Sequence, residues 1–352
     1  DPLTVIEQYG TDAFRFTLAA FAAQGRDVKM SDNRIEGYRH FVNKLWNAAR
    51  FSLMHIDEPH KEMNTGALSL PDCWILSRLH HVTQKTAEAI DAYRFNDAAS
   101  AVYNFVWHEF CDWYLEAIKP ALYEKEGPEK RTTTLSVLWS VMHDTLILLH
   151  PFMPFITEEI WHTLPGTQGS IMKAVFPSDQ KGGTAVIADD QAEADMNLCI
   201  KLISAIRNIR GEMNISPSKT LAAIVQTQDA KANTLIEAHQ DMIINLAKLK
   251  TFEVNQEAVR PKSSATAVVG AATLFVPLEG IIDFDLETRR LEKELNKLAK
   301  ELATVTKKLA NQNFLEKAPP DVVEKVKAKH AGLQEKQQKL QSHLDKIKQF
   351  EG

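Results

Sequence analysis

Cysteine is scarce in this sequence of 352 residues. The three cysteines, Cys73, Cys111 and Cys199, are odd in number and lie far apart. Such a set fits neither a disulfide framework nor a zinc site, and it favours a reducing compartment. No stretch approaches the ~18 uninterrupted apolar residues of a membrane span, and no basic segment followed by an apolar one indicates a secretory signal. The sequence therefore predicts a cytoplasmic protein with no membrane-spanning segment.

Nucleotide-binding and metal-binding signatures are absent as well. There is no G-x-x-x-x-G-K-[ST], no G-x-G-x-x-G after a strand and no H-E-x-x-H. The pair His80 and His81, and the helical neighbours His108 and Cys111, lack the second pair of ligands that a metal site needs. No nucleophile, base and orienting group come together in the sequence. We expect a binding or scaffolding unit with no catalytic residue, metal or cofactor of its own.

The composition is that of a globular protein, but its charge is unevenly distributed. Hydrophobic residues make up 44% and charged residues 25% of the chain, and its length suggests two or three domains. Residues 286–352 carry 15 Lys+Arg against 10 Asp+Glu, a net charge of +5, whereas the remaining 285 residues carry 26 against 36, a net charge of −10. A basic end segment on an acidic body indicates contact with a polyanion, although a solvated helical face has the same pattern.

Apolar spacing predicts a mainly α protein. Helical periodicity recurs through the first half without a convincing strand, and short β-branched runs appear only later. We predict four regions: a helical bundle over 1–164, a linker over 165–189, a small α+β domain over 190–283 and an arm over 284–352.

The arm is predicted from two runs of heptads. The first run holds Leu291, Leu295 and Leu298, the second holds Leu333, Leu340 and Leu344, and a segment with two prolines, 313–321, separates them. Two heptad helices joined by a short turn form an antiparallel coiled-coil hairpin. Each helix should be about 35–45 Å long, too thin for a globular core, so we expect the pair to project. With Leu291 at position d, three lysines fall at the outward f position: Lys293, Lys300 and Lys307.

Several motifs together resemble bacterial valyl-tRNA synthetases. These motifs are Y-G-T-D-A-F-R-F at 9–16, G-Y-R-H-F-V-N-K-L-W-N-A-A-R-F at 37–51, F-C-D-W-Y at 110–114, H-P-F-M-P-F-I-T-E-E-I-W at 150–161, I-R-N-I-R at 206–210 and the turn that begins at Asn313. The resemblance runs nearly end to end, and the closing coiled coil without cysteine distinguishes the valine enzymes from the isoleucine enzymes.

The resemblance implies that the chain is the part of the enzyme after the active site: an anticodon-binding helical bundle, an α+β junction and a tRNA-binding arm. The nucleotide-binding and editing domains should precede Asp1, so we expect the chain alone to be catalytically inactive, while the parent enzyme uses ATP and Mg²⁺. The triplet Lys29-Met30-Ser31 is not the catalytic loop of the family. It lies after the segment D-P-L at residues 1–3, which in the family comes after that loop. The implied partners are tRNA(Val) and the upstream catalytic domain, without DNA or membrane, and we expect a monomer.

The resemblance also implies the contact residues. Lys29, Asn33 and Phe51 fall at positions that contact the anticodon loop, and Arg34 and Arg50 lie beside them. RNA readers use aromatic and guanidinium planes for bases and cations for phosphates. The lysine row at Lys293, Lys300 and Lys307 should follow the tRNA body near the elbow. The alternative is that Phe51 belongs to the core and that the basic residues are only solvated.

Further polar and aromatic residues of these motifs are expected to be structural. Asn43 and Trp46 should serve in packing and in hydrogen bonds between helices. The aromatic residues Trp107, Phe110, Trp113 and Tyr114 are expected to be core rather than a stacking site. At the level of function, a structural scaffold with a docking arm, or the matching segment of an isoleucyl- or leucyl-tRNA synthetase, would fit many of the same features.

Overall fold

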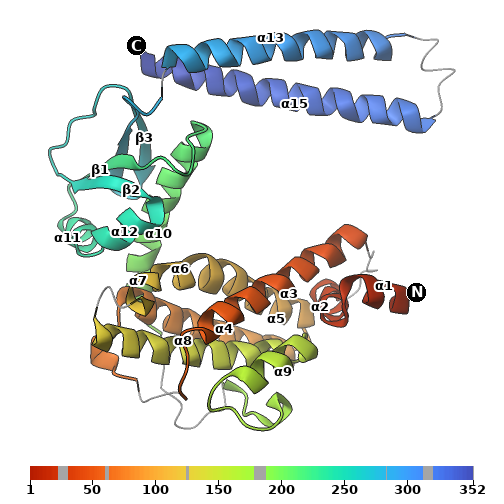
Figure 1. The fold of residues 1–352 in the computed structure, drawn as a ribbon, viewed down its shortest axis with the longest axis vertical. Helices are drawn as coiled ribbons and strands as arrows, with labels where there is room; N and C mark the ends of the chain where they lie inside the picture. Colours follow the sequence, from red (N-terminus) through yellow and green to blue (C-terminus); the bar gives the residue numbers. More distant parts are fainter. Residues whose placement is uncertain are drawn as a thin grey trace. The chain divides into compact units, whose positions relative to one another are not determined.

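The computed structural model divides the chain into two compact units, Asp1–Asn197 and Leu198–Gly352 (Figure 1). It describes residues 1–22, 31–59, 63–123, 127–177, 188–282, 284–311 and 320–351. The division between the units falls within one helix, α10 (Asp190–Glu212).

In its described residues, the first unit is a bundle of α-helices (Figure 1). These are α1 (Pro2–Tyr9), α2 (Thr11–Phe21), α3 (Asp32–Leu53), α4 (Leu70–Asp91), α5 (Phe95–Asn104), α6 (Leu115–Ala117), α7 (Lys119–Leu122), α8 (Pro128–Leu149) and α9 (Pro154–Thr163). A π-helical segment, Phe105–Tyr114, continues α5, and short 3₁₀ turns occupy Thr65–Ala67 and Ile171–Lys173. The mainly α fold that the sequence predicts for this region is confirmed.

One of the most buried helices of the bundle is α8. This helix begins with Pro128 after Gly127, whose φ of 93° suits glycine, and its apolar side chains are buried on most of its circumference. By length and composition alone, α8 could cross a membrane, but 67% of its most apolar window is buried inside the bundle. A core helix surrounded by other helices is apolar all round for the same reason.

An aromatic cluster joins α2, α3 and α5. The ring of Phe16 lies 4.8 Å from that of Tyr38 and 5.4 Å from that of Phe41, and Phe41 lies 4.8 Å from Tyr103. Of the four aromatic residues expected to be core, Phe110 and Tyr114 are fully buried, but Trp107 and Trp113 remain partly exposed.

Two buried carboxylates tie distant parts of the bundle together. Asp12 accepts hydrogen bonds from the backbone N–H groups of Phe155 (3.2 Å) and Ile156 (2.7 Å), and so caps the start of α9. Asp72 forms a capping box with Ser69 and also accepts from the hydroxyl of Tyr114 at 2.8 Å. Burial raises the pKa of both carboxyl groups above the ordinary value, although these hydrogen bonds oppose the shift.

Part of the predicted linker packs on the bundle. The indole N–H of Trp139 donates to the carbonyl of Pro165 at 2.8 Å, the hydroxyl of Ser170 donates to Glu158 at 3.1 Å, and Ile171 is buried. Residues 165–177 therefore extend the bundle, and residues 178–187 of the predicted linker lie outside the described residues.

The second unit contains a mixed four-stranded sheet. Its elements are β1 (Leu221–Thr227), α11 (Ala230–Ala238), α12 (Gln240–Ala247), β2 (Leu249–Val254), β3 (Ser264–Val269) and β4 (Ala272–Pro277). The strand order is β2-β1-β4-β3, with β1 and β2 parallel and the other two pairs antiparallel. The strands occupy the β-branched runs of the sequence, and α11 and α12 are separate helices because the backbone leaves helical geometry at His239.

Arg210, near the end of α10, organises this unit. Its guanidinium is buried and donates to four backbone carbonyls, those of Ser216, Lys219, Ala247 and Lys248, at 2.6 to 3.3 Å. The fixed fork of an arginine can satisfy several carbonyls at once. One side chain therefore joins α10 to the segments before β1 and β2.

The arm consists of α13 (Phe284–Leu309) and α15 (Pro320–Glu351), which lie side by side and antiparallel (Figure 1). Their 26 and 32 residues correspond to about 39 and 48 Å, so the second helix is slightly longer than expected. Leu291, Leu344 and Ile347 form a small buried core between them. The predicted turn between the helices lies almost wholly outside the described residues.

Ion pairs connect the flanks of the two arm helices. Glu301 pairs with Lys329 at 2.9 Å and Glu292 pairs with Lys348 at 2.9 Å. With Leu291 at d on α13, and with the buried Leu344 at a and Ile347 at d on α15, these are g–g and e–e pairs, which are the flanking pairs of an antiparallel coiled coil. The ion pairs thus favour the same antiparallel orientation of α13 and α15 as the apolar seam does.

Candidate nucleic-acid interface

The anticodon residues predicted from the sequence lie at two ends of α3. Asn33 and Arg34 are in its first turn and Arg50 and Phe51 in its last, about 27 Å apart along the axis. Lys29 lies outside the described residues. The structure therefore brings these side chains together as two groups on one helix and not as one compact site.

At the first end, Arg34 packs on an aromatic ring. Its guanidinium carbon is 4.5 Å from the centroid of the Phe21 ring, a cation–π contact between α3 and α2. Asn33 and Arg34 are both exposed. The stacked guanidinium is held in place while its outer face and N–H groups remain accessible.

At the other end, Phe51 belongs to a line of rings. Phe51 is half-buried, its ring lies 5.2 Å from that of His55, and the His55 ring lies 5.3 Å from that of Tyr123. The ammonium of Lys119 is 5.8 Å from the Phe51 centroid, and Arg50 is exposed. Phe51 is therefore neither an isolated surface ring nor a fully buried core residue, and cations lie near its exposed part.

The surroundings of His55 favour its neutral form. Burial lowers the pKa of His55, and the neighbouring positive charge of Arg131 lowers it further. These two effects favour a neutral imidazole between the rings of Phe51 and Tyr123.

Sequence reasoning missed the surface between these two ends. Asn43, Trp46, Asn47 and Arg50 are all exposed, and their spacing places them on one outward face of α3. The expectation that Asn43 and Trp46 serve in packing is wrong: 40% of Trp46 is exposed, because Leu45 and Ala49 point to the core instead. The sequence contained a signal for this surface, because these polar residues lie on the side of α3 opposite its apolar stripe.

A further cation lies beside this surface. The ammonium of Lys44 is 4.1 Å from the centroid of the Trp107 ring and pairs with Asp112 at 2.5 Å. Trp107 in turn stacks on Tyr103, with centroids 5.6 Å apart. These contacts connect α3 to α5 and to the π-helical segment, which is a feature found often at functional sites.

The lysine row on the arm is where the heptads place it. Lys293, Lys300 and Lys307 are exposed, while the a and d leucines of α13 are buried or half-buried. Lys293 and Lys300 also line a broad, open hollow of about 920 Å³ along α13. The row therefore presents positive charge outward without taking part in the apolar seam.

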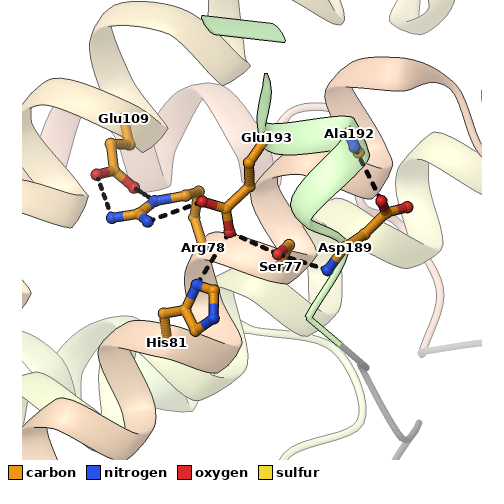
Figure 2. A network of polar contacts seen from close by, with 7 residues as sticks. All are labelled: Ser77, Arg78, His81, Glu109, Asp189, Ala192 and Glu193. Carbon is orange, nitrogen blue, oxygen red and sulfur yellow. Dashed lines mark hydrogen bonds and ion pairs between the residues drawn. The ribbon is translucent and has the colours of Figure 1, made fainter. Parts of the chain in front are cut away.

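A network of ion pairs fixes the start of α10 on the bundle (Figure 2). Arg78 on α4 makes a two-bond contact with Glu109 at 2.9 and 3.0 Å, and its third nitrogen bonds Glu193 at 3.1 Å. Ser77 donates to Glu193 at 2.6 Å, and His81 lies 2.9 Å from the same carboxylate. Burial alone would raise the pKa of Glu193, but these donors lower it below the ordinary value.

Comparison with known families identifies two regions of the chain. The model of the "Anticodon-binding domain of tRNA ligase" matches residues 72–225, and that of the "Valyl tRNA synthetase tRNA binding arm" matches residues 283–348. The first match begins after α3, so the face of α3 described above lies outside it.

Whole-chain relatives are valine–tRNA ligases. Those of Geobacter sulfurreducens (48% identity), Syntrophotalea carbinolica (46%) and Nitratidesulfovibrio vulgaris (46%) align with 99%, 99% and 97% of this chain. The chain spans about two fifths of their length, 40%, 39% and 38% respectively.

A weaker likeness is to a solved structure, the ternary complex of Agrobacterium radiobacter K84 agnB2 LeuRS–tRNA–LeuAMS. Its TM-score is 0.37 at 20% identity, over 49% of this chain and 20% of the other. This likeness is too weak to support an inference, whereas the two family models and the relatives agree with one another. The chain belongs to the valyl-tRNA synthetase family, of which it carries the anticodon-binding domain and the tRNA-binding arm.

Proposed function

We propose that this chain holds tRNA(Val) while the rest of a valine–tRNA ligase activates valine with ATP and Mg²⁺ and charges the tRNA. The bundle binds the anticodon stem-loop along α3, and the arm binds the tRNA body near the elbow. The protein acts as a cytoplasmic monomer. Catalytic and editing residues lie in the part of the enzyme that this chain does not include.

The observation that carries this proposal is the outward face of α3. Along one helix it offers an amide at Asn43, an indole at Trp46 and a guanidinium at Arg50, followed by the ring of Phe51. Unstacked RNA bases lie on aromatic and guanidinium planes, and amides bond their edges. A helical face with these groups and without an aliphatic cluster suits an RNA loop better than an apolar protein surface.

The lysine row supports the second half of the proposal. Lysines at position f make no contact between the helices of a coiled coil, so the seam of α13 and α15 does not require them. Three such lysines repeat at every seventh residue, about 10.5 Å apart. A row of this kind can neutralise successive phosphates of an RNA backbone without reading its sequence.

The test is binding of labelled tRNA(Val) to the purified chain over a series of salt concentrations, with unlabelled tRNA(Val), tRNA(Ile) and tRNA(Leu) as competitors. We expect a steep negative salt slope and competition that favours tRNA(Val). Equal competition by tRNA(Ile) or tRNA(Leu) would contradict the valine assignment. Weak, unselective binding by all three would favour a structural scaffold instead.

A further inference from the structure

The arm follows the sheet after a short connection. Only six residues separate the end of β4 from the start of α13. The N–H of Leu278 donates to the carbonyl of Ser263 at 3.0 Å. The carbonyl of Leu278 then accepts from the N–H groups of Ile281 and Ile282 at 3.0 and 3.1 Å. Residues 278–282 therefore form a hydrogen-bonded turn at the root of the arm.

A side chain from a distant part of the sequence holds this root. Lys219 is an exposed residue in the loop between α10 and β1, and its ammonium donates to the carbonyl of Ile281 at 2.9 Å. A hydrogen bond from a charged donor is stronger than one between neutral groups. The bond of Lys219 therefore adds to the backbone bonds that define the turn.

The loop that carries Lys219 is itself fixed. The carbonyl of Lys219 accepts from the guanidinium of Arg210 at 2.6 Å, and that of Ser216 accepts from the same guanidinium at 3.3 Å. Arg210 is buried near the end of α10. Hydrogen bonds thus run without a break from α10 through Lys219 to the root of the arm.

Small changes of direction at the root become large displacements along α13. Lys293 and Lys307 lie about 14 and 35 Å along the helix from Phe284, so a change of about 10° moves them by about 2 and 6 Å. The flexible stem of a lysine can compensate for the smaller displacement more easily than for the larger one. The outer part of the lysine row therefore depends most on a fixed direction of α13.

We propose that Lys219 is a positioning residue for tRNA binding, because its bond to Ile281 holds the direction in which the arm leaves the sheet. The inference rests on the proposed function, since it requires that the lysine row contacts tRNA phosphates. A direct contact between Lys219 and a phosphate is the competing explanation. Positioning makes the contribution of Lys307 depend on Lys219, whereas a direct contact adds to it independently.

The first experiment tests the root without RNA. Hydrogen exchange is measured on the full chain and on Lys219→Met, with Lys231→Met as the matched control. Lys231 is an exposed lysine on α11, so both variants remove one positive charge from the second unit. The amides of Ile281 and Ile282 should exchange about fivefold faster in Lys219→Met, the effect of one lost hydrogen bond. The control should match the parent, and Lys219→Arg should restore most of the protection.

The second experiment measures the salt slope of tRNA(Val) binding by the full chain. Lys293→Gln and Lys307→Gln are each made alone, with Lys219→Met and with Lys231→Met. Each glutamine variant alone should lower the slope by about 0.7–0.9, the effect of one lost phosphate contact. Combined with Lys219→Met, Lys307→Gln should lose most of its effect and Lys293→Gln should keep most of its own. Combined with Lys231→Met, both should keep their full effect.

Two results would overturn the inference while the proposed function stands. Unchanged exchange of Ile281 and Ile282 in Lys219→Met would mean that the bond does not hold the root. An undiminished effect of Lys307→Gln beside Lys219→Met would mean that Lys219 does not position the row, and an independent loss of slope would assign it a direct phosphate contact. A parent chain that does not bind tRNA would overturn the proposed function and the positioning role together.

Discussion

At the scale of single residues, Phe51 is the sharpest test of the proposed contact between α3 and the anticodon loop. Phe51→Ala should weaken tRNA binding by about 1–3 kcal/mol, the usual cost of a lost base stack. Phe155, which is 63% exposed on α9, supplies the control Phe155→Ala. Affinity is measured by fluorescence anisotropy and stability by thermal unfolding. A loss of affinity that follows a loss of stability would mean that Phe51 serves only the packing with His55.

The buried pair of Tyr114 and Asp72 gives a residue-scale prediction of pH dependence. Burial raises the pKa of Asp72 in the folded chain, so ionised Asp72 depends on its donors, among them the Tyr114 hydroxyl at 2.8 Å. Tyr114→Phe should destabilise the bundle by about 1.5–3 kcal/mol at neutral pH, the contribution of a hydrogen bond to a charged group.

This cost should shrink as the pH falls through the raised pKa of Asp72, because a protonated carboxyl accepts more weakly. In the parent, the raised pKa means that the folded chain binds this proton more readily than the unfolded chain. Its contribution to stability is therefore greatest at low pH and declines as the pH rises through the folded pKa. Urea unfolding of parent and variant at several pH values checks both statements, and a difference independent of pH would refute them.

At the scale of elements, the lysine row belongs to α13 as a whole. Changing Lys293, Lys300 and Lys307 to Gln should lower the salt slope of tRNA binding by roughly two and weaken binding of all tRNAs alike, because phosphate contacts carry no sequence information. Helicity measured by circular dichroism should be unchanged, since f positions lie outside the seam.

The control for the lysine row is Lys325→Gln/Lys327→Gln/Lys339→Gln, which removes three exposed charges from α15. It should change the slope much less. A parent-like slope in the α13 variant, or an equal loss in the control, would mean that the row is only a solvated face or that another side of the arm meets the RNA.

The start of α10 is a second element whose placement can be tested. Glu193→Gln removes the charge that Arg78 and His81 contact, and should destabilise the first unit by about 1–2 kcal/mol. Because the pKa of Glu193 is lowered on folding, its contribution is present above the ordinary pKa of a glutamate and is lost as the pH falls through the lowered value.

Hydrogen exchange measures this effect directly. Amides at the start of α10 should exchange faster in Glu193→Gln than in the parent at neutral pH, and the difference should diminish in acid. Unchanged protection at neutral pH would show that Ser77 and the cap at Asp189, which accepts from the N–H of Ala192 at 2.8 Å, hold the helix without the charge.

At the scale of the whole molecule, the uneven charge of the chain predicts that the arm accounts for most of the salt dependence of tRNA binding. Residues 286–352 carry a net charge of +5 and the rest of the chain −10. A chain that ends at Asp283 should therefore bind tRNA more weakly and with a clearly smaller salt slope than the full chain. Its binding should still respond to Phe51→Ala. A truncated chain with the parent's slope would mean that the bundle, despite its net charge, makes the phosphate contacts.

The sequence by itself determined the class of the elements and their order. Helical periodicity, the β-branched runs and the heptads depend on local spacing, so the bundle, the strands and the arm were predictable, and Lys293, Lys300 and Lys307 were correctly placed outward. What only the tertiary structure decided are the contacts between residues far apart in the chain. Arg34 stacks on Phe21, Phe51 shares its surface with Tyr123, and the indole of Trp46 lies outside while that of Trp161 is buried. The physical reason is that spacing along a helix determines which side chains share a face, but only the packing of other helices determines which face is covered.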